Sequence, residues 1–201
     1  MAMLEARGLA LERGGRCLFE NLEFDLEPGD TLLLTGPNGS GKSSLLRLLG
    51  GFTRAGAGQV RWNGVATDLR TSEYRCQLHY VGHSNATKSR LTVGENLEFM
   101  TILTGGKSAG NSADPFSIAG LANRLGRYLS AGQKRRLALT RLAASFRPIW
   151  LLDEPGVGLD RSSRQRLQQL IGEHRDKGGI CIVASHGDVA LADPLVLELG
   201  R

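Results

Sequence analysis

Apolar residues along the chain follow patterns that predict mainly strands in the first third and alternating strands and helices in the last third. Partly alternating segments at residues 4–12 and 18–27, separated by a Gly-Gly turn signal, are typical of strands with one buried face. Longer apolar runs are typical of strands buried on both faces, and they occur in TLLLTG (31–36), PIWLLDEP (148–155) and GICIVASH (179–186). Shorter strands are expected at residues 58–64, 78–82 and 194–200. The order predicts an α/β fold with a parallel sheet.

Helices are predicted between these strands. The segments concerned are residues 44–52, 91–103, 117–125, 130–146 and 161–179. The helix at 44–52 should end on its Gly pair, and Ser130 is placed to cap the helix that follows it. A Gly/Ser-rich loop is expected at residues 104–115.

Composition changes this picture little. Hydrophobic residues make up 41% and charged residues 22% of the 201 residues, which favours a globular chain over a disordered one. Stretches free of charge are too short for a membrane span, and the start lacks the apolar core of a signal peptide, so a cytosolic chain is expected. Three cysteines without a CxxC pair favour neither disulfides nor a zinc site. The net charge of +5 is too small to choose among anionic partners.

The segment GPNGSGKS satisfies the pattern G-x-x-x-x-G-K-[ST] and lies between an apolar strand and a helix, as a phosphate-binding loop requires. Glycines let backbone N–H groups converge on phosphate oxygens, and the helix start adds its positive dipole end. Lys42 is the candidate for the β- and γ-phosphates, and the Ser43 hydroxyl for Mg²⁺. The residues predicted to bind nucleotide here are Gly36, Pro37, Asn38, Gly39, Ser40, Gly41, Lys42 and Ser43. The alternative is a plain Gly-rich turn.

Two acids follow the apolar run IWLL. Asp153 is a candidate second ligand of Mg²⁺, and Glu154 a candidate general base for water that attacks the γ-phosphate. His186 ends another apolar run; if the two strands are parallel, its imidazole would reach the same crevice and contact the γ-phosphate and the water. A carboxylate pair at an ordinary strand end and a structural histidine are the alternatives.

The segment LSAGQKRR at residues 129–136 resembles the LSGGQ signature of ATP-binding-cassette (ABC) ATPases. The motif order also matches that family: phosphate loop, signature, DE strand end, GLD loop at residues 158–160, then His186. The resemblance implies a P-loop NTPase with a RecA-like core, an antiparallel β-subdomain and a small helical subdomain. Residues 1–83 and 146–201 would form the core with the β-subdomain, and residues 84–145 the helical subdomain.

The resemblance also implies the cofactors ATP and Mg²⁺ and a partner. In this family two ATPases pack head to tail, so the signature of one clamps the γ-phosphate held by the other, and hydrolysis releases the clamp. The residues implied in this contact are Ser130, Ala131, Gly132 and Gln133.

Within the family, the chain resembles the ATPase subunit of the bacterial haem exporter for cytochrome c maturation. The stretches that carry this resemblance are the opening at residues 3–24, HYVGHSNATKSRLTVGENLEF at 79–99 and YLSAGQKRRLALTRL at 128–142. It implies a peripheral subunit at the cytoplasmic face of the inner membrane, bound to an integral-membrane subunit through residues 84–96. Haem export and release of haem loaded onto a periplasmic chaperone are both implied activities.

Other classes stay open. The first is another compact ABC export ATPase; the second is a cassette ATPase that acts on DNA or ribosomes, although the coiled coil or tandem cassette usual there is missing. A simple P-loop kinase would have no use for the signature or His186. Nucleic acid is not an expected partner, because basic residues are scattered apart from Lys134, Arg135 and Arg136, which are interpreted as a solvated helix face.

Four positions depart from the family pattern. Ala131 replaces a signature glycine, which a helix's first turn should tolerate, and Gly158 stands where Ala is commoner. His83 replaces a Gln that touches Mg²⁺ or water and senses the membrane partner, and the haem-exporter group shares this histidine. No aromatic residue near residues 11–15 is placed to stack on adenine, for which the guanidinium of Arg13 is a candidate.

Overall fold

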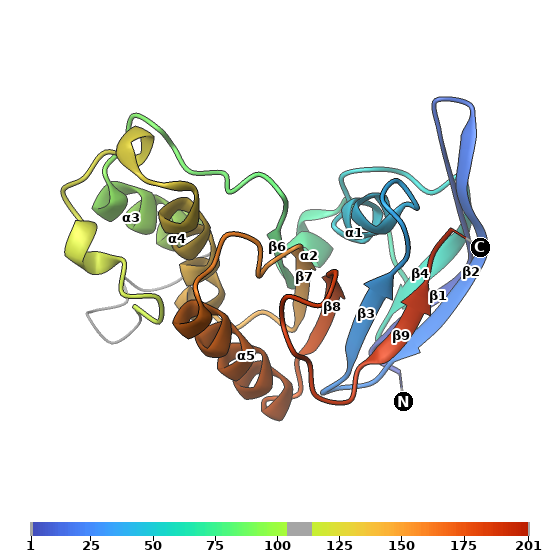
Figure 1. The fold of residues 1–201 in the computed structure, drawn as a ribbon. Coiled ribbons are helices and arrows are strands. Elements are labelled where there is room, and N and C mark those ends of the chain that lie inside the picture. The colour runs from blue at the N-terminus through green and yellow to red at the C-terminus, as the bar shows by residue number, and fades with distance from the viewer. Residues whose placement is uncertain (1, 104–113, 201) are drawn as a thin grey trace.

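The computed structural model describes residues 2–103 and 114–200 and arranges them around two β-sheets (Figure 1). The first sheet is antiparallel in the order β2-β1-β4-β5. Its first two strands pair as an antiparallel hairpin across the predicted Gly-Gly turn, in which Gly14 and Gly15 have positive φ. The strands of this sheet are β1 (Leu4–Arg13), β2 (Arg16–Leu26), β4 (Ala57–Trp62) and β5 (Val65–Ala66).

The second sheet has the order β6-β7-β8-β3-β9, and each neighbouring pair is parallel. Every residue of β7 and β8 is buried, because helices or the other sheet cover both faces of the sheet centre. Parallel strands end on one edge, so the loops after β3, β7 and β8 leave the sheet side by side. The strands are β3 (Thr31–Thr35), β6 (Leu78–Val81), β7 (Ile149–Asp153), β8 (Ile180–Ala184) and β9 (Leu195–Glu198).

Two apolar clusters cover the faces of the parallel sheet. On one face Leu151 and Ile182 pack with α1 and the antiparallel sheet, and on the other Trp150 and Val183 pack with α4 and α5. A third, smaller cluster unites α3, α4 and the chain before α4, at the far side of Figure 1 from the antiparallel sheet. The helices are α1 (Lys42–Leu49), α2 (Ser72–Arg75), α3 (Val93–Leu103), α4 (Ala131–Ala144), α5 (Arg161–Asp176) and the 3₁₀ turns Ala119–Leu121 and Gly126–Tyr128.

The α/β class and the predicted strands are confirmed, but the helix predicted at residues 117–125 is wrong. Only Ala119–Leu121 forms a 3₁₀ turn there, because Ser117 has φ +52° and the Asp114 carboxylate accepts the N–H groups of Ile118 and Ala119. Sequence patterns also missed β5 and α2. Most of the loop expected at 104–115 lies outside the described residues.

Among residues 2–103 and 114–200, no helix combines the length and the apolar character that crossing a membrane would require.

Candidate functional site

The phosphate-binding motif forms a loop between β3 and the first turn of α1. Gly36 has φ +126° and Gly41 has φ +106°, and a Cβ at Gly36 would collide with the Leu199 carbonyl oxygen, so glycine is required there. The Lys42 ammonium turns back over the loop and donates to the carbonyl oxygens of Gly36 (2.7 Å) and Pro37 (3.0 Å). The loop thus encloses a positive charge next to the start of a helix, an arrangement suited to an anion.

Ser43 and Asp153 meet although 110 residues separate them. The Ser43 hydroxyl donates to Oδ1 of Asp153 at 3.0 Å, and Asp153 is the last residue of the buried strand β7. A hydroxyl and a carboxylate are hard oxygen donors of the kind that Mg²⁺ prefers, with phosphates and water as its other ligands. The pair therefore fits Mg²⁺ bound together with a nucleotide.

Glu154 turns away from the strand direction. Its φ of +48° lies in the left-handed region, which non-glycine residues rarely adopt and which recurs at functional sites. Its N–H donates to the carbonyl oxygen of Ala184 in β8 at 2.8 Å. Burial raises the pKa of the Glu154 carboxyl above its ordinary value, and the nearby His186 opposes this rise. A carboxyl with a raised pKa is a stronger base once it is ionised.

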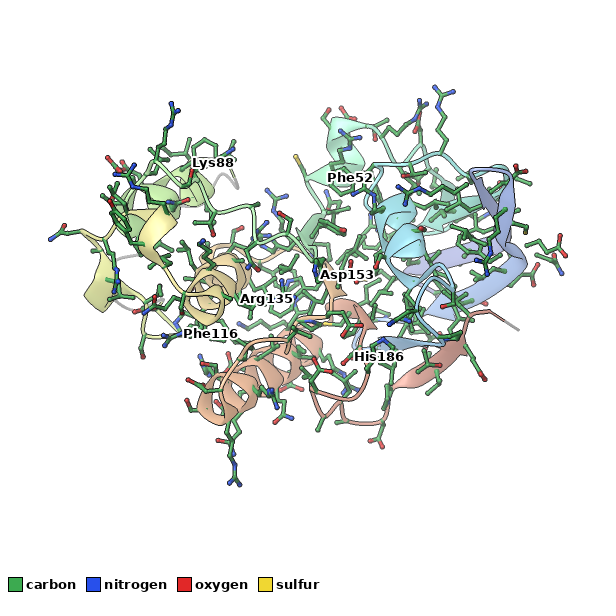
Figure 2. All side chains as sticks on the ribbon, turned by 45° about the horizontal axis from the view of Figure 1, so that its top comes forward. Phe52, Lys88, Phe116, Arg135, Asp153 and His186 are labelled. Carbon is green, nitrogen blue, oxygen red and sulfur yellow. The ribbon has the colours of Figure 1, made fainter. Side chains whose placement is uncertain are left out.

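His186 lies beside both the carboxylate and the phosphate loop. Its Nε2 is 3.5 Å from Oε1 of Glu154 and 3.1 Å from Oδ1 of Asn38. Apart from Gly36, Pro37 and Ser40, the residues that sequence patterns assigned to the phosphate loop, the metal and catalysis line one cavity of about 470 Å³. Figure 2 shows two of them, Asp153 and His186, near the middle of the molecule. The lining residues are Arg13, Leu18, Asn38, Gly39, Gly41, Lys42, Ser43, Ser44, His83, Asp153, Glu154, Val157 and His186.

The signature segment lies apart from this cavity. Ser130 caps α4: its hydroxyl accepts the Gln133 N–H, and the Gln133 side chain accepts the Ser130 N–H. Ser130 and Ala131 are exposed, and Gly132 packs so closely on Gly158 that a Cβ would lie 2.8 Å from its carbonyl oxygen. Of residues 130–133, none lines the cavity described above.

The interpretation of residues 134–136 as a solvated face is wrong for Arg135. This side chain is only 4% exposed and binds carbonyl oxygens at the end of β7, whereas Lys134 and Arg136 are half-buried. The physical reason is its position in α4, on the same face as the buried Ala138 and Leu142. This spacing is visible in the sequence and indicates a buried position, but the positive charge of Arg135 favours the opposite prediction.

A glycine loop with its lysine on a parallel sheet, a serine–aspartate pair and a second carboxylate together define a P-loop nucleoside triphosphatase. The model of the ABC transporter family matches residues 19–157. The chain therefore belongs to the ABC transporter family and is an ABC-type, ATP-binding ATPase.

Curated relatives place the chain more narrowly. The cytochrome c biogenesis ATP-binding export protein CcmA of Rhodospirillum rubrum is 46% identical over 98% of this chain and 86% of its own length. Its counterpart from Paramagnetospirillum magneticum is 42% identical over 98% and 93% of the two chains. At this identity and coverage the chain belongs to the family of cytochrome c biogenesis ATP-binding export proteins.

Solved structures agree in fold. A dimeric ATP-binding cassette in a post-hydrolysis state, bound to ADP and phosphate, superposes with a TM-score of 0.81 at 22% identity and covers 99% of this chain and 97% of its own. An ATP-binding subunit of an ABC transporter has a TM-score of 0.80 at 21% identity, over 92% and 80% of the two chains. The predicted ABC-type fold is confirmed.

Proposed function

We propose that this ATPase drives a step of cytochrome c biogenesis as the peripheral subunit of a membrane complex, at the cytoplasmic face of the bacterial inner membrane. Its relatives are named export proteins of that process. The step would be haem export or release of a haem-loaded chaperone. The observation that carries the catalytic part is the contact of Ser43 with Asp153, beside Lys42 and Glu154 in one cavity.

ATP would lie with its phosphates on the loop at residues 36–43. Backbone N–H groups and the start of α1 would bind the phosphate oxygens, and Lys42 would exchange its contacts with loop carbonyls for the β- and γ-phosphates. Ser43 and Asp153 would hold Mg²⁺, which offsets negative charge on the phosphates when it is bound.

Glu154 would orient the attacking water and take its proton, a role worth about 10²–10⁴-fold in rate. His186 would contact the γ-phosphate from beside Glu154, with Asn38 fixing its imidazole. The left-handed backbone at Glu154 supports this assignment because it directs the carboxylate into the cavity rather than along the strand.

Arg13 would stack on adenine. It lines the same cavity at the end of β1, and the lining residues include no Phe, Tyr or Trp. A guanidinium plane stacks on a base much as an aromatic ring does. His83 lines the cavity too, and we assign it to the contact with Mg²⁺-bound water or with the membrane partner.

The signature would complete the site of a second copy. Exposed Ser130 and Ala131 at the start of α4, outside their own chain's cavity, suit binding to a γ-phosphate held by a head-to-tail partner. In this arrangement residues 84–145 form the helical subdomain, and residues 84–96 contact the membrane subunit. The rest of the chain forms the core with the β-subdomain.

The Glu154→Gln variant tests the proposal. It keeps the shape of the side chain but removes the base, so ATP should bind normally while turnover falls about 10²–10⁴-fold and an ATP-loaded dimer accumulates. Turnover is measured by phosphate release, and the dimer by size-exclusion chromatography with ATP. Normal turnover would exclude Glu154 as the base.

Membrane association is tested separately. The chain should sediment with membranes only when its integral-membrane partner subunit is co-expressed. Association with ribosomes or DNA instead would favour an ABC ATPase that does not serve transport.

A further inference from the structure

Arg135 occupies the junction of three segments that the chain keeps far apart in sequence. It projects from the second turn of α4 toward the end of β7 and toward the segment after β6. Figure 2 shows Arg135 beside Asp153, between the helices α3 and α4 and the parallel sheet. None of these contacts involves the phosphate loop, so the residue does not belong to the nucleotide contacts described above.

The guanidinium finds an acceptor for each of its donors. Arginine carries five N–H groups in a planar fork. Nη2 donates to the carbonyl oxygens of Asp153 (2.7 Å) and Glu154 (2.6 Å), and Nε donates to that of Pro155 (3.2 Å). Nη1 donates to the carbonyl oxygen of Gly82 (2.8 Å) and to Oδ1 of Asn85 (3.1 Å).

Three consecutive carbonyls around Glu154 are thus held by one cation. The Glu154 N–H is held independently by Ala184 of β8. The backbone is therefore anchored both before and after the Cα atom of Glu154, the residue that adopts φ +48°. An unfavourable backbone conformation persists only where its surroundings over-determine it. The direction of the Glu154 side chain follows from that backbone conformation.

We infer that Arg135 is a positioning residue for hydrolysis, which holds the backbone turn at Glu154 and ties it rigidly to the start of α4. The inference rests on the proposed role of Glu154 as base. Ser130 and Gln133 lie within the first turn of the helix that carries Arg135. Displacement of the helix start therefore moves the carbonyls of Asp153 to Pro155 and, with them, the carboxylate. A nucleotide that contacts the signature would thereby change the position of the catalytic carboxylate in the same chain.

The test is the Arg135→Gln variant of the full chain, with Arg141→Gln as its matched control. Arg141 is another arginine of the same helix, and burial lowers the pKa of its guanidinium. It donates to the carbonyl oxygens of Tyr80, Asn85 and Ala138 but to none at the end of β7. Both changes should lower the melting temperature. Only Arg135→Gln should lower kcat, by about 30-fold, because displacement of a catalytic group by about 1 Å costs up to 10²-fold.

The split between kcat and KM separates positioning from folding. For Arg135→Gln the KM and the Kd for ATP should stay within about threefold of the parent, since the phosphate loop keeps its contacts. Arg135→Lys keeps the cation but replaces the planar fork by a single ammonium, so kcat should remain at least tenfold low, to a first approximation. This variant carries the test if the glutamine variant does not fold.

Three outcomes would overturn the inference: an unchanged kcat in Arg135→Gln, equal losses of kcat in Arg135→Gln and Arg141→Gln, or full activity in Arg135→Lys. Comparison with Glu154→Gln keeps the two proposals apart. Normal turnover by Glu154→Gln refutes the base itself. An inactive Glu154→Gln with fully active Arg135 variants refutes the positioning role alone.

Discussion

The phosphate-loop cavity and the start of α4 both carry motifs for ATP, yet they are built in opposite ways. The cavity joins groups remote in sequence: Ser43 bonds Asp153 across 110 residues, and His186 bonds Asn38 across 148. At the start of α4 the bonds are local, because Ser130 and Gln133 satisfy each other within one turn. The cavity therefore exists only when the parallel sheet is assembled, whereas the capped helix start is a feature of one helix.

This difference indicates separate roles for the cavity and the start of α4. The cavity holds a lysine, a metal-binding pair and a base, and so has the parts for hydrolysis. The start of α4 has no acid or base of its own among residues 130–133 and offers an exposed, already capped surface. Substitutions in the two regions should then damage different steps.

The largest effect is expected for Lys42→Ala, which removes the charge inside the phosphate loop. Each charge-assisted hydrogen bond is worth about 1.5–3 kcal/mol, so loss of its phosphate contacts should weaken ATP binding about 100-fold or more. Equilibrium titration with a fluorescent ATP analogue measures the change. Normal binding by this variant would refute the assignment of the phosphate loop.

A smaller and different effect is expected for Ser130→Asp. Aspartate is as good an N-cap as serine, so α4 should keep its start, but the new carboxylate would repel a γ-phosphate. Turnover should fall about 100-fold, the lower end of the loss caused by removing one charge-stabilising donor, while a single chain still binds ATP. Ser130→Asn is the matched control, since it keeps the cap without the charge and should retain most of the activity.

Mixing the two variants tells whether the regions act in one chain or in two. In a head-to-tail dimer of Lys42→Ala with Ser130→Asp, one site combines both lesions and the other combines the intact cavity with the intact signature. Turnover should therefore rise when the two impaired preparations are mixed. A mixture with no more turnover than its components, although the mixed dimer forms, would contradict a signature that acts in trans.

Sequence reasoning was most successful where a motif requires a local conformation. The loop at residues 36–43 and the cap at Ser130 form as their patterns predict, because glycine at positive φ and a Ser-x-x-Gln capping box each act over a few residues. The meeting of Ser43 with Asp153 also follows from motif knowledge, since parallel strands bring their carboxyl ends to one edge.

It was wrong where long-range partners decide. The sequence favours a solvated Arg135, because a charged side chain in a helix usually faces water. Its burial depends on carbonyl oxygens at the ends of β6 and β7, which only the folded sheet brings to α4. The helix predicted at 117–125 does not form, because the Asp114 carboxylate accepts hydrogen bonds from the N–H groups of Ile118 and Ala119.

The smallest effect is expected for Ala131→Gly, which restores the glycine usual in the signature. Ala131 is the first residue of α4 and is exposed. Removal of its methyl group therefore costs no buried packing contacts. Glycine should lower stability by no more than about 0.5–1 kcal/mol through backbone entropy. Turnover should stay within about twofold if the partner's phosphate contacts backbone N–H groups rather than the side chain. Parallel assays of turnover and melting temperature separate the two effects. A gain of tenfold or more in turnover would mean that the methyl group obstructs the partner's nucleotide. The signature would then fit the partner's cavity less closely than it does in relatives with glycine there.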